Sequence, residues 1–335
     1  MRAFTEQVLR VATLALAAQA VHGAVVIPVT PPPDAVSTVV FGINDDNVIA
    51  GSYTDAGGIE HGFVGQLNGT YEVFDVGSST GTEPRAIAHN DTVVGFATDP
   101  EYVIGRQFVR LFDGTVVPIM KDGVALDGVA QGVATRRMEG YISVGDYLDE
   151  TLTFYSGYLA TNGRYTRDFN LNIPNVLNTR PRAINGGGTI AGFVETLDAV
   201  RHGFIAKVGR VQIIDADDTG TTVLEGMNDN EFAAGQVADA EGNPHSFTFD
   251  NTTGEFRTID IGDGSTFQQA WGVNNARLIA VSTSIGASYI YCSKRPNRCP
   301  AGGFEVPDGR SPIGSRASPL ALRMAPGTPI RGAIQ

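Results

Sequence analysis

Gly42-Ile43-Asn44 is the first of six occurrences of one short phrase, which consists of a small residue, an aliphatic residue and often Asn. The others are Ala86-Ile87-Ala88, Gly132-Val133-Ala134, Ala183-Ile184-Asn185, Gly226-Met227-Asn228 and Gly272-Val273-Asn274. Their central positions lie 44, 46, 51, 43 and 46 residues apart. A nearly constant period of this length is typical of modular folds, in which each repeat buries its apolar faces against its neighbours.

Each repeat contains four short apolar segments. In the fourth repeat the phrase is followed by Gly186-Gly187-Gly188 and then by segments 189–194, 202–208 and 211–215. Glycines between short β-branched runs indicate hairpins, because Gly adopts positive φ without steric cost. We therefore expect one four-stranded antiparallel meander per repeat, and an all-β six-bladed β-propeller over residues 25–306. The third repeat carries a four-residue insertion near residues 136–139.

The N-terminal segment 25–29 reads Val-Val-Ile-Pro-Val and is similar to the outer strands expected at residues 73–76 and 213–215. The sixth repeat has clear second and third strands at 278–282 and 288–292. We expect the N-terminal strand to complete this last blade and close the ring. Residues 303–306 are the rival for the same place.

Composition supports one closed domain of short strands. The chain has 335 residues, of which 42 % are hydrophobic and 18 % are charged, and it contains 41 glycines. The net charge is −12, but residues 294–335 hold seven basic and two acidic residues, so the rest carries −17. An acidic body argues against binding to nucleic acid or to an anionic membrane. We expect neither partner, and we expect a monomer.

The first 24 residues have the pattern of a signal peptide. Arg2 and Arg10 precede an apolar run at 11–18, which leads into Ala18-Gln19-Ala20 as a cleavage sequence. No later stretch approaches the roughly 20 apolar residues needed to span a bilayer. We expect a protein that is secreted to the periplasm or the extracellular space. Its basic Pro/Gly/Ser-rich tail, residues 307–335, is predicted to be disordered.

The chain contains two cysteines, Cys292 and Cys299. A pair of cysteines this close in an exported chain is expected to form a disulfide. It would pin the start of the basic tail to the last strand of the sixth repeat.

Part of each repeat is a triplet that ends in an aromatic residue. It reads His61-Gly62-Phe63, His202-Gly203-Phe204 and His245-Ser246-Phe247, with Gln107-Phe108, Gly157-Tyr158 and Ser288-Tyr289 in the other repeats. The fuller pattern, Gly-Ile-Asn-Asp, a strand ending in Gly and then His-Gly-Phe, is clearest over residues 42–64. Over residues 40–292 the chain resembles the extracellular HAF repeat family, named for a His-Ala-Phe-like triplet. The resemblance implies a secreted bacterial protein with a propeller-like fold, and no settled activity or cofactor.

The histidines at 61, 202 and 245 could suggest a zinc or copper site. Because they occupy equivalent positions in separate blades, a ring would hold them apart. We expect each to bond a neighbouring backbone group instead, and we expect no metal and no cofactor. Acidic clusters at 45–46, 215–218 and 260–263 lack a calcium-loop spacing and are explained by turn propensity.

The position two before each central aliphatic residue is the most varied one in the repeat. It is occupied by Phe41, Arg85, Gln131, Arg182, Glu225 and Trp271. We expect the chain to enter the innermost strand of each blade at this position. Equivalent positions in successive blades lie at equal radius, so we expect these six side chains to ring one mouth of a central channel. Arg recognises carboxylates and aromatic rings offer a face to sugars, which makes this ring the candidate ligand site. Alternatively, the arginines pair with Glu225 or Glu83 and brace the blades.

The function expected from these features is a secreted, non-catalytic binding or scaffold protein that presents loops to an extracellular protein or polysaccharide. The alternative is an extracellular lyase or glycoside hydrolase acting on an acidic polysaccharide at the channel mouth. In that alternative Arg85 and Arg182 neutralise a uronate carboxylate, and Glu225 is the candidate acid or base. An open pocket with unpaired polar atoms favours the enzyme, and a channel filled by paired side chains favours the scaffold.

Overall fold

The computed structural model describes residues 23–306 except 137–139, 149–153, 217–220, 239–241, 243 and 295–297. Every element in this part of the chain is a β-strand, so the predicted all-β class is confirmed. None of the described residues forms a helix long and apolar enough to cross a membrane. Residues 137–139 of the insertion, the tail 307–335 and residues 1–22 of the expected signal peptide lie outside the described residues.

Each of the first three repeats forms a four-stranded antiparallel meander. The first contains β2 (Ala35–Ile43), β3 (Val48–Asp55), β4 (Glu60–Gln66) and β5 (Tyr71–Phe74). The second contains β6 (Gly81–Ile87), β7 (Val93–Thr98), β8 (Arg106–Arg110) and β9 (Val116–Pro118). The third contains β12 (Gly128–Arg136), β13 (Gly140–Leu148), β14 (Tyr155–Thr161) and β15 (Arg164–Asp168). A small hairpin, β10 (Met120–Lys121) and β11 (Val124–Ala125), joins the edge of the third meander.

The later repeats follow the same order. The fourth contains β16 (Val176–Ile184), β17 (Ile190–Thr196), β18 (Arg201–Lys207) and β19 (Arg210–Ile214). The fifth contains β20 (Thr222–Met227), β21 (Phe232–Ala238), β22 (Pro244–Asp250) and β23 (Glu255–Thr258). The sixth contains β24 (Gln268–Val273), β25 (Leu278–Thr283) and β26 (Ser288–Cys292), and its sheet is extended by β1 (Ala24–Pro28) and β27 (Phe304–Val306).

The fourth place in the last sheet is taken by β1, which pairs with β26 from Val25 opposite Cys292 to Pro28 opposite Tyr289. The rival segment also joins the sheet, but it pairs on the outer side of β1 as β27. The predicted disulfide links Cys292, at the end of β26, to Cys299. The first and the last strands of the described chain are therefore neighbours.

The first strands begin earlier than the phrase suggests. In the first repeat the phrase begins at Gly42, whereas β2 covers Ala35–Ile43, because Ala35 still pairs with Asp55 at the far end of β3. In the fourth repeat β16 likewise starts at Val176. The phrase therefore lies at the end of the first strand, and its Asn begins the following turn.

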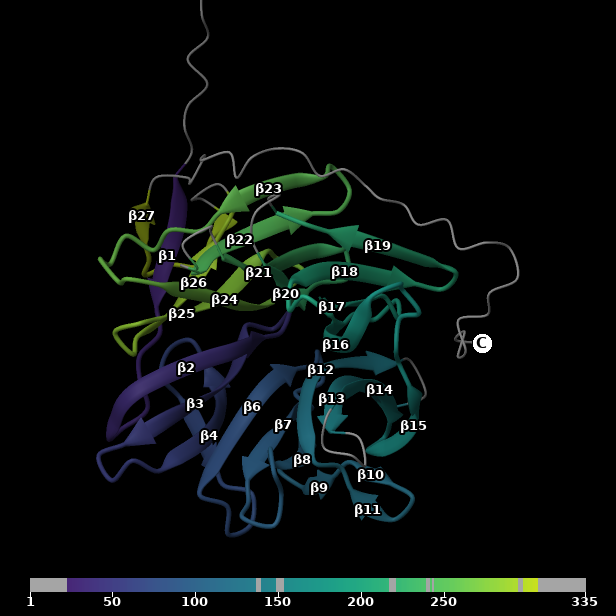
Figure 1. The fold of residues 1–335 in the computed structure, drawn as a ribbon. Coiled ribbons are helices and arrows are strands. Elements are labelled where there is room, and N and C mark those ends of the chain that lie inside the picture. The colour runs from purple at the N-terminus through teal and green to yellow at the C-terminus, as the bar shows by residue number, and fades with distance from the viewer. Residues whose placement is uncertain are drawn as a thin grey trace, which may run out of the picture.

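The first strands lie side by side near the middle of the molecule, and the fourth strands lie at its edge (Figure 1). Strand β2 contacts β6, each later first strand contacts the next, and β24 contacts β2. The small residue of the phrase permits this approach. A Cβ on Gly226 would lie 2.3 Å from the Trp271 carbonyl oxygen, and one on Gly272 would lie 2.7 Å from that of Phe41.

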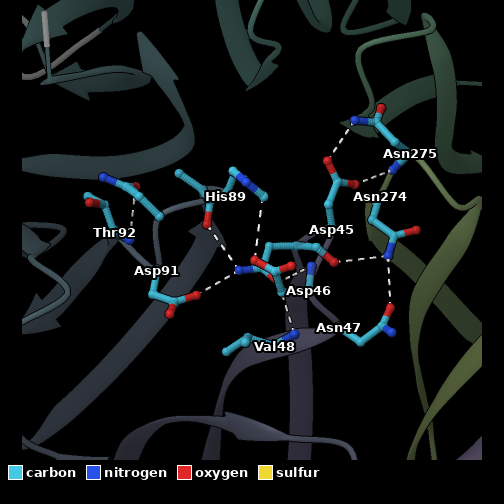
Figure 2. A network of polar contacts seen from close by, with 12 residues as sticks. Asp45, Asp46, Asn47, Val48, His89, Asp91, Thr92, Asn274 and Asn275 are labelled. Carbon is cyan, nitrogen blue, oxygen red and sulfur yellow. Dashed lines mark hydrogen bonds and ion pairs between the residues drawn. The ribbon is translucent and has the colours of Figure 1, made fainter. Parts of the chain in front are cut away.

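The Asn of the phrase bonds one repeat to the next. Asn274 donates through Nδ2 to the Asn44 carbonyl oxygen at 2.9 Å, and Asn44 donates to the Ala88 carbonyl oxygen at 3.2 Å (Figure 2). Asn185 and Asn228 make the same contact to the repeats that follow them. The Oδ1 atom of each Asn accepts from the backbone of its own turn, as Asn274 does from Leu278. These four asparagines are buried, so each fastens its turn to the neighbouring repeat.

The Gly expected to end the second strand lies inside it, because each second strand continues three or four residues further. It lies directly opposite the aromatic residue of the triplet. The pairs are Gly51 with Phe63, Gly95 with Phe108, Gly145 with Tyr158, Gly192 with Phe204 and Gly235 with Phe247. All five aromatic side chains are at most 1 % exposed. A Cβ on any of the five glycines would lie 2.1–2.3 Å from a carbonyl oxygen of the first strand, and at Gly51 and Gly145 it would also lie 2.9 Å from the aromatic ring. The Gly therefore lets the first and second strands approach each other.

Two of the triplet histidines bond to carboxylates, not to the backbone groups that we expected. His61 Nδ1 lies 3.0 Å from Asp75 Oδ1, and His202 Nδ1 lies 3.0 Å from Asp215 Oδ1. Each of these Asp residues directly follows the fourth strand of its repeat, so the pair joins the third strand to the end of the fourth. The described residues contain no group of three or more His, Cys, Asp or Glu placed to hold a metal ion.

We predict that replacing His61 makes stability depend less on pH. Burial lowers the pKa of His61, but the hydrogen bond to Asp75 and the nearby Asp55 carboxylate outweigh it and raise the pKa above its usual value. The charged pair therefore stabilises the fold fully below the unfolded pKa of about 6.5, and this contribution is lost as pH rises through the folded pKa. In urea unfolding, His61→Gln should lower the free energy of unfolding by about 0.5–1 kcal/mol at pH 5.5 and by less at pH 9.

His89→Gln is the matched control, because His89 is 63 % exposed and lies 3.7 Å from its nearest carboxylate, Asp46. Its loss should be smaller at both pH values. An equal loss for His61→Gln at pH 5.5 and pH 9 would show that the charged pair does not contribute.

Candidate functional site

A β-bulge sits at the same place in every first strand. The register with the second strand shifts between Val40 and Gly42, Pro84 and Ala86, Ala130 and Gly132, Pro181 and Ala183, Leu224 and Gly226, and Ala270 and Val273. The skipped residues include all six candidate site residues. A bulge leaves its extra residue outside the regular pairing and redirects the side chain.

The candidate residues lie near the end of their strands, not at the start as we expected. Phe41, for example, is the third residue from the end of β2, and Glu225 holds the same place in β20. The expectation failed because the first strands extend further toward the N-terminus than the phrase indicates. The bulge could not be read from the sequence, since it is a property of strand register.

All six side chains line one cavity. Phe41, Arg85, Gln131, Arg182, Glu225 and Trp271 surround it together with the two residues that follow each of them. Its volume is about 70 Å³. A cavity of roughly 150 Å³ encloses one benzene molecule, so this one is too small to enclose a sugar ring.

Arg85 lies between two aromatic rings on one side of this cavity. Its Cζ atom is 4.4 Å from the centre of the Phe41 ring and 4.7 Å from that of Trp271. Its Nη1 donates to Glu83 Oε1 at 2.5 Å, and its Nε donates to Gln131 Oε1 at 3.3 Å. These contacts join four repeats and occupy the guanidinium group, as the bracing interpretation predicts.

Arg182 and Glu225 form an ion pair on the other side, with Arg182 Nε 3.6 Å from Glu225 Oε2. Their side chains are only 12 % and 10 % exposed. Burial lowers the pKa of Arg182, and the Glu225 carboxylate opposes this shift. The Nε atom has no hydrogen-bond partner among the described residues, because 3.6 Å is too long for such a bond.

A second ion pair lies between the third and fourth repeats and was not predicted. Asp146 is fully buried and accepts from Arg180 Nη2 at 2.7 Å. The Arg180 guanidinium also lies 4.0 Å from the centre of the Tyr155 ring. The residue after this Gly of the second strand is Asp in the third repeat alone, so the repeat pattern holds no signal for Asp146.

The central aliphatic residues of the phrase form a belt beneath the cavity. They are Ile43, Ile87, Val133, Ile184, Met227 and Val273, each at most 8 % exposed. The same six residues also line a second cavity of about 100 Å³, whose other walls are the two residues after each of them. An apolar belt thus separates two small polar cavities.

Polar side chains from different repeats meet at the rim of this second cavity. The backbone N–H and the Nδ2 of Asn275 both donate to the Asp45 carboxylate at 2.7 Å (Figure 2). Asp229 and Gly186 continue the series, since Gly186 N–H donates to Asp229 and Asp229 N–H donates to Asn275. The clustered Asp and Asn residues therefore satisfy backbone groups of neighbouring repeats, in agreement with their interpretation as turn residues.

No protein-family model and no curated protein matches the chain. Among solved structures it is similar to virginiamycin B lyase from Staphylococcus aureus, with 9 % identity over 80 % of this chain and 99 % of that chain and a TM-score of 0.46. It is also similar to the Aleuria aurantia lectin (12 % identity, 81 % and 100 % coverage, TM-score 0.48). A gluconolactonase from Xanthomonas campestris gives 12 % identity, 82 % and 92 % coverage and a TM-score of 0.47. All three TM-scores are below 0.5, so these likenesses are too distant to indicate a function for this chain.

We predict that Arg85→Met changes the fluorescence of Trp271, the only Trp of the chain. The substitution keeps an unbranched apolar stem but removes the guanidinium cation that lies against the indole, and it should cost about 1–2 kcal/mol of stability. Arg201→Met is the control, because Arg201 also lies against an aromatic ring, that of Phe193, but is 44 % exposed at the side chain. Unchanged emission in Arg85→Met would contradict the stacked arrangement.

Proposed function

We propose that the six repeats are the six blades of a β-propeller closed by β1, and that the chain belongs to the extracellular HAF repeat family. The cyclic contacts of the first strands support the blade count. The pairing of β1 with β26 and the hydrogen bond from Asn274 to Asn44 support closure between the last and the first repeat. The paired Gly and aromatic residues give the HAF-like pattern a structural reason.

We propose further that the protein is a secreted, non-catalytic binding or scaffold protein. One observation carries this proposal: the charged side chains at the channel are paired with one another around a cavity of about 70 Å³. A glycan-cleaving site needs a cleft that admits a sugar ring and two suitably placed acid–base groups. In this cavity Glu225 faces Arg182, and Arg85 pairs with Glu83, which lies outside the lining of the cavity. The arginines brace the ring of blades.

The alternative, an enzyme acting on an acidic polysaccharide, is favoured by a single feature. Arg182 Nε is buried beside the cavity without a hydrogen-bond partner in the described chain. A carboxylate could accept from it, but only after the cavity had widened enough to admit a uronate.

Binding is better placed on the loops that join the second and third strands. In five repeats this loop carries an exposed large hydrophobic residue, and in the fifth repeat most of the loop lies outside the described residues. These residues are Ile59, Val103, Phe154, Leu197 and Ile285, which are 41–70 % exposed. Equivalent loops lie on one face of a propeller, so this face combines apolar side chains with a rigid frame for an extracellular protein or polysaccharide. The disulfide supports export to an oxidising compartment.

An array of acidic and neutral glycans tests this proposal. The protein lacking residues 1–24 is applied, and both retained protein and newly formed chain ends are measured. We predict no cleavage of any glycan, and equal retention of the protein and of its Glu225→Gln variant. Cleavage by the unchanged protein that Glu225→Gln abolishes would replace the scaffold proposal with the enzyme.

A further inference from the structure

Three exposed apolar side chains lie on neighbouring segments where the last repeat joins the first. Val36, Phe267 and Ile285 are 70 %, 38 % and 63 % exposed. Ser284, next to Ile285, donates its N–H to the Phe267 carbonyl oxygen at 3.1 Å, and Thr38 donates to the Gly286 carbonyl oxygen at 2.9 Å. These two bonds hold the three segments together. We call Val36, Phe267 and Ile285 the seam patch.

Carboxylates border the seam patch. Asp34 lies two residues before Val36, and Asp260 and Asp263 lie in the loop that leads from β23 to Phe267. Within the described part of the chain, none of these three carboxylates forms an ion pair. The patch therefore suits a segment that combines apolar side chains with cations.

The described chain ends in the sheet that carries this patch. Val306, its last residue, packs in one core with Ile261, and a Cβ on Gly262 would lie 3.5 Å from the Val306 side chain. Ile261 in turn donates its N–H to the side chain of Gln268, the neighbour of Phe267, at 3.0 Å. The 29 residues that follow Val306 can extend to roughly 95 Å, which is long enough to reach from Val306 to any part of the seam patch.

The segment after Asp308 has the matching chemistry. Residues 309–335 contain Arg310, Arg316, Arg323 and Arg331 and no Asp or Glu. Leu320, Leu322, Met324, Ile330 and Ile334 are interleaved with the later arginines. The segment thus carries apolar side chains that could cover the exposed side chains of the patch, and positive charges that could pair with its carboxylates.

We propose that residues 309–335 dock on the seam patch of their own chain, with apolar side chains on Val36, Phe267 and Ile285 and arginines near Asp34, Asp260 and Asp263. Docking covers the loop face between the last and first repeats and leaves the rest of that face free. The inference stands independently of the binding role proposed above, because it uses only the patch and the chain's own sequence.

Limited trypsin digestion of the full chain tests this docking, because trypsin cleaves after the arginines of the segment. Cleavage after Arg323 and Arg331 is followed by intact mass and compared with a free peptide of residues 309–335. A docked fraction of four in five slows cleavage about fivefold, since cleavage follows the open population. We expect Ile285→Ser and Asp34→Asn to restore much of the peptide's rate. Leu197→Ser is the matched control, because Leu197 is equally exposed at 70 % but belongs to the fourth repeat, and it should leave the protection unchanged.

Three results would overturn the proposal. The segment could be cleaved as fast as the free peptide in the unchanged protein. It could be protected equally in the Ile285→Ser and Leu197→Ser variants, which would place it elsewhere. Protection that disappears on tenfold dilution would show that the segment comes from a second copy of the chain.

Discussion

The close approach of the six first strands is the constraint on which the rest of the structure depends. At Gly226 and Gly272 the backbone of the next repeat lies where a Cβ would stand, so strand contact and side-chain size are directly linked. The aliphatic residue that follows fills the axis, and the Asn after it bonds to the next repeat. The small residue, the aliphatic residue and the Asn of the phrase therefore form one joint between neighbouring repeats. The repetition of this joint makes the fold modular.

The same constraint shapes the polar centre. Because the first strands converge, a bulge in each of them brings one side chain per repeat to a common cavity. Charges brought together in so little space must be paired, since an unpaired buried charge is costly. Arg85 with Glu83 and Arg182 with Glu225 meet this requirement. The variety of the six residues fits the pairing of unlike charges around the cavity, where uniform charges would repel.

Much of this arrangement could be predicted from the sequence because the repeats align. Strand order and the set of six candidate residues follow from position within the period, and the disulfide follows from the close spacing of the two cysteines in a chain expected to be exported. Features set by strand register could not be predicted. The bulge at Phe41 is one, and the partner of His61 is another, because Asp75 becomes its neighbour only through the pairing of β4 with β5. Asp146 was missed for a different reason, since it belongs to one repeat alone.

The most direct test compares two joints of the proposed ring by urea unfolding. Asn228→Ala removes the bond between the fifth and sixth repeats, and Asn274→Ala removes the equivalent bond between the sixth and the first. A closed ring predicts one cooperative transition and similar losses of about 2 kcal/mol for both variants. In an open array Asn274→Ala would lose only the bond within its own turn. A loss clearly smaller than that of Asn228→Ala would contradict the ring.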